Sequence, residues 1–308
     1  MPTAAQSRRT RRIAVVLTAV LALLVGSLFD TSAASARAGR QSPSSADHHA
    51  WHHHRSYLAL GDSVPFGYRP PAVTPPTDYL DADNFVGYPD LVAHRLHLRL
   101  TNAACPGETT ASFITEGAQS NGCENSVGSP VGYRTVYPLH TDYQGTQLGF
   151  AVRYLRQHRH TRLVTVMIGT NDLFVCRQVT ADACTGPDFT ATVGQVEHNL
   201  DTILRALRDA GRYRHRLVVV SYYSPDYGDA ATTGSVQVLD AALARAAAAH
   251  RAVVADGFGA FQAASEPFGG DACAAGLLVE LPTGGCNAHP SAAGHRLLAR
   301  AVVRVARP

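Results

Sequence analysis

The chain has 308 residues, of which 45% are apolar, and its charged side chains comprise 27 basic and 24 acidic residues. This length and composition suit a globular protein and exclude a chain that is disordered throughout. Every basic residue is an arginine, which excludes a Walker-type phosphate loop, a Schiff-base enzyme and a Ser/Lys hydrolase dyad, because each of these needs a lysine.

The first 38 residues are typical of an export signal. Four arginines at positions 8 to 12 precede an apolar run over residues 13–29, and small residues follow as far as Ala38. This order predicts a signal peptide over residues 1–38, cleaved after Ala36 or Ala38, and a secreted protein. The alternative is a retained membrane anchor, since about seventeen mostly apolar residues approach the shortest spanning helix.

The positive charge of the chain belongs to this leader. Residues 1–38 contain five arginines and one aspartate, so their removal lowers the net charge from +3 to about −1. The mature chain then has no excess of basic residues with which to bind a nucleic acid. We therefore expect no DNA or RNA partner.

Residues 39–55 are rich in serine and histidine and carry no apolar period, which predicts a flexible linker before a domain over residues 56–308. Neutral imidazoles are good ligands for a transition metal, and this segment contains His48, His49, His52, His53 and His54. We prefer the interpretation of a solvated tail, and we predict no metal site.

From Ser56 onward, short runs rich in β-branched residues alternate with segments of helical period, which is the pattern of a parallel α/β sheet. Strands are predicted at Tyr57–Leu60, Leu98–Thr101, Leu163–Ile168, Leu217–Ser221 and Ala252–Ala255. Helices are predicted along Val193–Leu207, along Ala241–Ala249, and along Leu297–Val305 with Pro290 in the first turn. Two long loops, 69–84 and 117–145, are expected to border a cleft in this single domain.

The six cysteines are not arranged as paired C-x-x-C metal ligands. In an exported protein they are expected to oxidise. Six cysteines allow fifteen pairings, and the lower entropy of closing short loops favours sequence neighbours. This predicts the bridges Cys105–Cys123, Cys176–Cys184 and Cys273–Cys286.

Polar blocks follow the predicted strands, at the edge where reactive groups of an open parallel sheet gather. They are Gly61-Asp62-Ser63, Asn102–Gly107, Gly169–Asp172 and, further along the chain, Asn287–Pro290. In this order the four blocks resemble the motifs of the GDSL or SGNH hydrolase family, and the resemblance spans Tyr57 to the C-terminal helix. It is strongest to the secreted actinobacterial lipases and esterases of that family that carry three disulfides.

The resemblance implies a flavodoxin-like three-layer α/β/α fold with a central parallel sheet of about five strands, and hydrolysis of esters or related acyl groups. Ser63 is the expected nucleophile, because a hydroxyl just past a strand end can form an acyl-enzyme once a base takes its proton. His289 is the expected base, placed before Pro290 at a helix entrance where the dipole disfavours imidazolium. His295 is its nearest rival.

The resemblance also implies an oxyanion hole, made by the backbone N–H groups of Ser63 and Gly107 and by the side-chain amide of Asn171. Fixed donors of this kind stabilise the negative oxygen of a tetrahedral intermediate. Asp62 and Asp172 flank these residues, and we expect them to have structural roles as acceptors of hydrogen bonds from turn amides.

One position departs from the family pattern. Members with a full triad carry an aspartate three residues before the histidine, and Cys286 stands there in this chain. Some relatives use a main-chain carbonyl to accept the second N–H of the histidine, and we expect the loop of the third disulfide to supply one, in preference to Asp271 or Asp256. Asn287 ranks lower, because neighbouring residues rarely reach each other's side chains. The sequence therefore predicts a serine–histidine dyad with a carbonyl assistant.

The leading functional hypothesis is a secreted serine hydrolase of acyl lipids or short-chain esters that needs no metal or cofactor. Phe66, Tyr68, Phe113 and Tyr133 are candidates to wall an acyl pocket, yet aromatic rings also stack on sugars, so phospholipids and acetylated polysaccharides are alternative substrates. A non-catalytic cell-surface binding module is the alternative from another class, favoured by the missing aspartate. We expect a monomer with no membrane span after signal cleavage.

Overall fold

Five short parallel strands form the central sheet of the computed structural model, which describes residues 55–73 and 75–306. The strands are β1 (Ser56–Gly61), β2 (Arg99–Asn102), β3 (Thr161–Met167), β4 (Arg216–Val220) and β5 (Val253–Ala255). Neighbouring strands pair in parallel, in the spatial order β2-β1-β3-β4-β5. The prediction of a flavodoxin-like sheet with five parallel strands is confirmed.

The predicted signal peptide and the histidines at positions 48–54 lie outside the described residues. Within residues 55–73 and 75–306, no helix is both long enough and apolar enough to cross a membrane.

The helices of the described chain follow the amphipathic segments of the sequence. They are α1 (Ser63–Phe66), α2 (Tyr88–Leu96), α3 (Thr110–Ile114), α4 (Tyr133–Val136), α5 (Gln147–Gln157), α6 (Thr170–Val179), α7 (Pro187–Arg208), α8 (Ala230–Ala249), α9 (Gly257–Ser265) and α10 (Ala292–Ala306), with single 3-10 turns at η1 (Ala82–Asn84) and η2 (Glu266–Phe268). The predicted stripe of α7 is buried from Val193 to Leu207. Pro290 does not open the last helix as predicted, because it ends a strand and α10 begins at Ala292.

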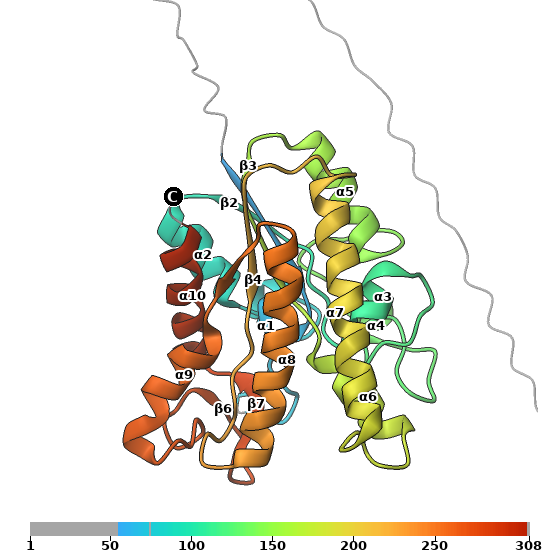
Figure 1. The fold of residues 1–308 in the computed structure, drawn as a ribbon. Helices are drawn as coiled ribbons and strands as arrows, with labels where there is room; N and C mark the ends of the chain where they lie inside the picture. The colour runs from blue at the N-terminus through green and yellow to red at the C-terminus, as the bar shows by residue number, and fades with distance from the viewer. Residues whose placement is uncertain (1–54, 74, 307–308) are drawn as a thin grey trace, which may run out of the picture. The chain divides into compact units, whose positions relative to one another are not determined.

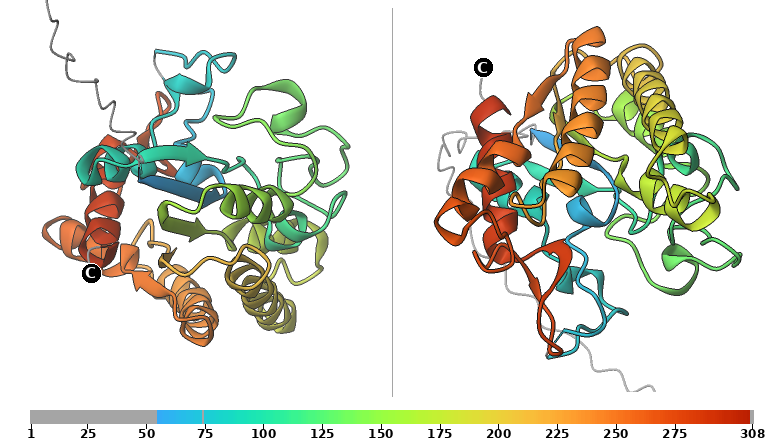
Figure 2. Two further views of the ribbon diagram at one scale, coloured as in Figure 1. Left: turned by 90° about the horizontal axis from the view of Figure 1, so that it is seen from above. Right: turned by 60° about the horizontal axis from the view of Figure 1, so that its bottom comes forward.

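Helices cover both faces of the sheet. Helices α2 and α10 pack together on one face with α9 beside them, while α5, α7 and α8 cover the other face (Figure 1, Figure 2). Strand β1 is buried along its whole length, as expected for a parallel strand between two helical layers. This three-layer arrangement leaves the two edges where the strands begin and end as the places for polar groups.

A two-stranded hairpin that was not predicted precedes α10. Strands β6 (Leu278–Glu280) and β7 (Cys286–Pro290) pair antiparallel, and β7 lies against α1. The Cys273–Cys286 disulfide ties the first residue of β7 to the preceding loop. The Cys105–Cys123 and Cys176–Cys184 bridges are also present, so the three predicted pairings are confirmed.

Candidate active site

Ser63 is presented at the carboxyl end of β1 by a close approach between two strands. Gly61 ends β1 with a φ of +132°, and a Cβ atom there would lie 1.9 Å from the carbonyl oxygen of Met167. Only glycine fits this position. The side chain of Asp62 then accepts a hydrogen bond from the Val64 N–H at 2.9 Å and caps α1. Ser63 is therefore the first residue of a helix at the carboxyl edge of the sheet.

The two aspartates beside the site hold the backbone in place. The second oxygen of Asp62 accepts a hydrogen bond from the Tyr222 hydroxyl, and Asp172 accepts from the Thr110 N–H at 2.9 Å and from its hydroxyl at 2.6 Å. Burial raises the pKa of Asp62 to about 7 and that of Asp172 to about 6. These contacts fit the structural roles expected from the sequence.

Gly107 and Asn171 reach the same cavity as Ser63 from two other strand ends. Gly107 follows β2 with a φ of +82°, and a Cβ there would lie 2.5 Å from the carbonyl oxygen of Asn121. Asn171 lies in the first turn of α6, directly after β3, and is buried. The three residues expected to form the oxyanion hole therefore line one cavity.

Asn121 joins two of these residues, and sequence reasoning missed it. Its backbone N–H donates to the Gly107 carbonyl at 2.8 Å, and its side-chain NH₂ donates to the Asn171 amide oxygen at 2.8 Å. Gln178 in turn donates to the Asn121 amide oxygen at 3.0 Å. Because the oxygen of Asn171 is engaged in this way, its NH₂ group is the part left for the cavity. No motif marks Asn121, but it lies inside the loop closed by the first disulfide.

His289 lies on β7 and contacts Ser63 directly. Its Nε2 is 2.9 Å from the Ser63 Oγ, although the two residues are 226 positions apart in the chain. The Tyr68 ring packs on the imidazole at a centroid distance of 4.9 Å. The Tyr223 hydroxyl donates to the backbone carbonyl of Ala288 at 2.7 Å. These contacts hold the imidazole over the serine hydroxyl.

The second nitrogen of the imidazole is bound by a side chain and not by the main-chain carbonyl predicted from the sequence. The Asn287 Oδ1 accepts hydrogen bonds from the backbone N–H of His289 at 3.1 Å and from its Nδ1. A backbone N–H only donates, so the atom it meets is the amide oxygen, and Nδ1 must carry the proton. The Nε2 lone pair therefore faces Ser63. The imidazole is thus in the tautomer that a general base requires.

The prediction about Asn287 was wrong because β7 is irregular at this point: Val279 pairs with Asn287 and Leu278 with Pro290, which leaves Ala288 and His289 in a bulge. The Asn287 side chain turns toward the backbone N–H two residues on, and this local turn brings it beside the imidazole of His289. The two distant aspartates have other partners: Asp256 caps α9 through the Gly259 N–H, and Asp271 accepts from the Cys273 N–H at 2.7 Å.

Burial lowers the pKa of His289 to about 4. This cause differs from the helix dipole expected from the sequence, since α10 begins three residues further on. The rival His295 is buried within α10, and burial lowers its pKa to about 3. Both imidazoles are neutral at neutral pH, but only His289 contacts Ser63.

The cavity around these residues has a volume of about 570 Å³. Apart from the polar groups already described and the side chains of Thr170, Arg177, Thr232 and Ser235, its walls are apolar and aromatic, with side chains that include Tyr68, Tyr133, Leu173, Phe174, Val236 and Leu239. Two of the four aromatic residues proposed from the sequence line it. Phe66 and Phe113 do not, because both are fully buried in the core.

One group of residues in the described chain resembles a metal site by composition. Cys105, Glu108 and Cys123 bring three potential ligand atoms within 4.8 Å of one another. The two sulfur atoms are bonded to each other in a disulfide, and the Glu108 carboxylate accepts hydrogen bonds from Ser112 and from Gln147. The group therefore fits a structural role and not a metal ion.

A hydroxyl and an oriented imidazole in contact at the carboxyl ends of parallel strands form the arrangement that serine hydrolases use for acyl transfer. The comparison with protein families agrees, since residues 59–297 match the GDSL-like lipase/acylhydrolase family. The chain belongs to this family, as the sequence resemblance predicted. It is a carboxylic ester hydrolase.

No curated protein sequence matches the chain. Among solved structures, it is similar to an alpha/beta hydrolase from the metagenome of Lake Arreo, Spain, with 19% identity, a TM-score of 0.50, and coverage of 82% of this chain and 94% of the other. It is also similar to a catalytic mutant of an acetylxylan esterase from Geobacillus stearothermophilus, with 17% identity, a TM-score of 0.50 and the same coverage. A lipase from a goat rumen metagenome has 13% identity and a TM-score of 0.50, with coverage of 82% and 97%. At these identities the likeness concerns the fold.

Proposed function

We propose that the protein is a secreted serine hydrolase of acyl esters, with Ser63 as nucleophile, His289 as general base and Asn287 as the residue that orients the base. The observation that carries this proposal is the hydrogen-bond chain from the Asn287 side chain through the imidazole to the Ser63 hydroxyl. The Ser63 hydroxyl lies at a cavity that Gly107 and Asn171 also line.

The reaction follows from this geometry. The Nε2 of His289 takes the proton of the Ser63 hydroxyl while the Oγ attacks the ester carbonyl carbon, which gives a tetrahedral intermediate. The bond from this carbon to the alcohol oxygen then breaks, and His289 returns its proton to the leaving alcohol. Water, deprotonated by His289, attacks the acyl-serine, and the carboxylic acid leaves as Ser63 regains its proton.

Negative charge develops on the former carbonyl oxygen in both tetrahedral intermediates. The N–H groups of Ser63 and Gly107 and the NH₂ of Asn171 are the donors for this oxygen. Asn121 fixes two of them through its hydrogen bonds to Gly107 and Asn171. Loss of one such donor reduces the rate by about 10² to 10³ in other hydrolases.

The walls of the cavity favour an apolar acyl group over a sugar. Leu173, Phe174, Val236 and Leu239 line it and offer contact surface to an acyl chain, while the polar side chains of Arg177, Thr232 and Ser235 occupy a smaller part of the wall. Acyl lipids and short-chain esters are therefore the leading substrates. A phospholipid presents the same acyl group, and an acetylated polysaccharide presents the smallest one, so rates across a series of acyl chain lengths separate these classes.

Secretion is supported by the three disulfides, because such bridges persist in oxidising compartments. Expression of the full chain in a host with an export pathway, followed by N-terminal sequencing of the protein in the medium, tests this part. A new N-terminus near residue 39 is expected, and retention of the intact chain in the membrane would contradict it.

Labelling with a fluorophosphonate tests the catalytic assignment. We expect an adduct on Ser63 that disappears in Ser63→Ala and is strongly reduced in His289→Ala. Ser235→Ala is the matched control: this serine lines the same cavity, but its hydroxyl donates to the Ala231 carbonyl at 2.9 Å. Folded, oxidised protein that is not labelled at Ser63 would contradict the assignment and favour a non-catalytic binding module.

A further inference from the structure

Arginines gather at the edge of the sheet opposite to the catalytic cavity. Strands β2 and β4 begin with Arg99 and Arg216, Arg55 directly precedes β1, Arg162 is the second residue of β3, and Arg251 lies two residues before β5. Because the five strands are parallel, these arginines lie together at the amino ends of the strands. Ser63 lies at the opposite side, beyond the carboxyl end of β1. Figure 1 shows the start of β1 at one end of the molecule and the β6–β7 hairpin at the other.

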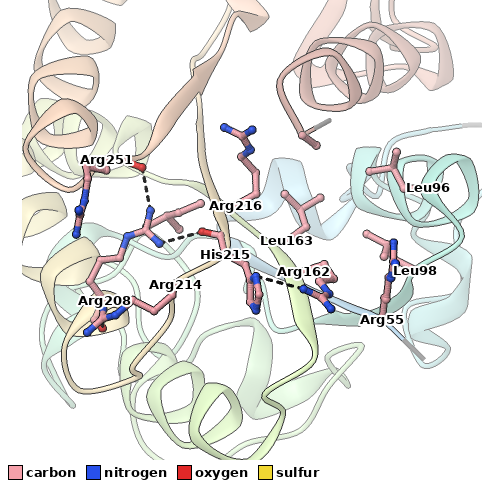
Figure 3. Close-up of a pocket in the computed structure, with 12 residues that line it drawn as sticks. Arg55, Leu96, Leu98, Arg162, Leu163, Arg208, Arg214, His215, Arg216 and Arg251 are labelled. Carbon is pink, nitrogen blue, oxygen red and sulfur yellow. Dashed lines mark hydrogen bonds between the residues drawn. The ribbon is translucent and has the colours of Figure 1, made fainter. Parts of the chain in front are cut away.

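All of these except Arg99 line a hollow of about 780 Å³ (Figure 3). We call it the arginine hollow. Its lining consists of basic and apolar side chains and contains no aspartate or glutamate from the described residues. The lining residues are Arg55, Leu96, Leu98, Arg162, Leu163, Arg208, Arg214, His215, Arg216, Leu217, Arg251 and Ala306. Within the described part of the chain, arginines form the ion pairs Arg134–Glu124, Arg205–Asp201 and Arg245–Glu197, and five arginines of the hollow take part in none of these three: Arg55, Arg162, Arg208, Arg214 and Arg251.

One of these cations is held rigidly without a carboxylate. The Arg208 guanidinium donates to the backbone carbonyls of His250, Tyr213, His215 and Arg251, at distances between 2.9 and 3.3 Å. Figure 3 shows the side chain reaching between the segments that lead into β4 and β5. A fixed guanidinium in this position gives the hollow a permanent positive charge.

The positive charges are close enough to affect one another. Burial lowers the pKa of Arg208, and the neighbouring charges of Arg251 and Arg214 lower it further. Burial and the charges of Arg162 and His160 lower the pKa of His215 in the same way. A bound anion would relieve this repulsion, because it is attracted to several guanidinium groups at once.

We propose that the arginine hollow binds a linear anionic polymer of phosphate groups other than a nucleic acid and tethers the hydrolase to it while the catalytic cavity stays open. Guanidinium groups recognise phosphate oxygens in pairs, and the spread of the hollow's arginines over the starts of β1, β3 and β5 suits a chain of phosphates better than a single ion. A membrane surface fits less well, since the large apolar side chains that are exposed in the described chain do not line the hollow.

Binding of the secreted, oxidised protein to a short linear polyphosphate of defined length tests the proposal. In the variant Arg55→Gln/Arg162→Gln/Arg251→Gln, three exposed arginines of the hollow lose their charge, and we expect affinity to fall about tenfold or more. The slope of log affinity against log salt should decrease by about one unit for each arginine that contacts a phosphate. A second variant changes three exposed arginines away from the hollow, Arg69→Gln/Arg153→Gln/Arg296→Gln, and removes the same net charge.

The expected result is that only the hollow variant loses affinity, while the hydrolysis of a small soluble ester is the same in all three proteins. Equal losses in both variants would mean that net charge alone attracts the polymer, and would overturn the proposal. So would an absence of binding by the unaltered protein. Stronger hollow-dependent binding to vesicles of phosphatidylglycerol and phosphatidylcholine, or to duplex DNA, would replace the phosphate polymer with a membrane or a nucleic acid.

Discussion

The hydrogen bond between Asn287 and His289 leads to the sharpest prediction about catalysis. In Asn287→Leu, a side chain of similar size removes the acceptor and leaves a buried imidazole N–H without a partner. This costs about 1 to 3 kcal/mol, and it also removes the preference for the tautomer whose Nε2 lone pair faces Ser63. We therefore expect kcat/KM for a small soluble ester to fall by about 5- to 150-fold.

The substitution Asn287→Asp separates orientation from packing, because it places a carboxylate beside the same nitrogen. Hydrolysis needs neutral His289, so kcat/KM falls as the pH drops through its pKa, which burial lowers to about 4 in the native protein. A carboxylate in contact favours the imidazolium and raises such a pKa by about 1 to 3 units. The acid limb of the pH profile should move upward by that amount in Asn287→Asp and should not move upward in Asn287→Leu.

Steady-state rates from acid to neutral pH measure both effects, with thermal unfolding to verify that each variant folds. Glu280→Gln is the matched control, since this exposed side chain lies on the partner strand β6 of the same hairpin. If Asn287→Leu retained native rates and Asn287→Asp left the acid limb in place, Asn287 would not orient the base. Another acceptor, such as a backbone carbonyl, would then have to be sought.

Three further predictions follow from other contacts. In Asn121→Ala, the Asn171 amide loses its hydrogen-bond partner, so kcat should fall by about tenfold with little change in KM. This is less than the 10² to 10³ expected for loss of an oxyanion donor itself. Equal kcat values for the variant and the native protein would contradict this prediction. In Cys273→Ser/Cys286→Ser, urea unfolding should show a free energy of unfolding reduced by about 2 to 4 kcal/mol. Activity should also be lower, because the disulfide holds β7 and β7 carries the base. Full activity in this variant would show that the disulfide does not position His289. Burial raises the pKa of Asp62 to about 7, so the folded protein binds the carboxyl proton of Asp62 more tightly than the unfolded chain does. The stability that this protonation contributes is therefore lost as the pH rises from about 4 to 7. The stability of Asp62→Asn relative to the native protein should therefore increase over that range, and a constant difference would show that Asp62 does not titrate there.

The central strands β1, β3 and β4 were predictable because they are buried on both faces along most of their length. A parallel strand between helical layers appears in sequence as a short run of branched apolar residues, and Leu163–Ile168 and Leu217–Ser221 are runs of this kind. The β6–β7 hairpin has no such pattern. Its strands are short, and the five residues between them include Pro282, Gly284 and Gly285, so neither an apolar period nor a helical one reveals it.

The residues that touch the reacting groups were easier to predict than those that hold them. Ser63, Gly107, Asn171 and His289 lie in recognisable blocks after strand ends, and the structure brings all four to one cavity. Asn287 and Asn121 act through side-chain hydrogen bonds whose geometry depends on a strand register and a loop path. Neither of these is encoded in a local pattern of residue types, which is why one residue was ranked too low and the other was missed.

The base and its orienting amide are two residues apart on a single short strand, so they move as one rigid piece. Local motion of the β6–β7 hairpin changes the distance from the imidazole to the nucleophile without changing the tautomer. Activity therefore depends on whether β7 is packed against α1. Thermal inactivation can therefore precede global unfolding, and a reversible loss of turnover on gentle heating, with the far-UV circular dichroism unchanged, would be its signature.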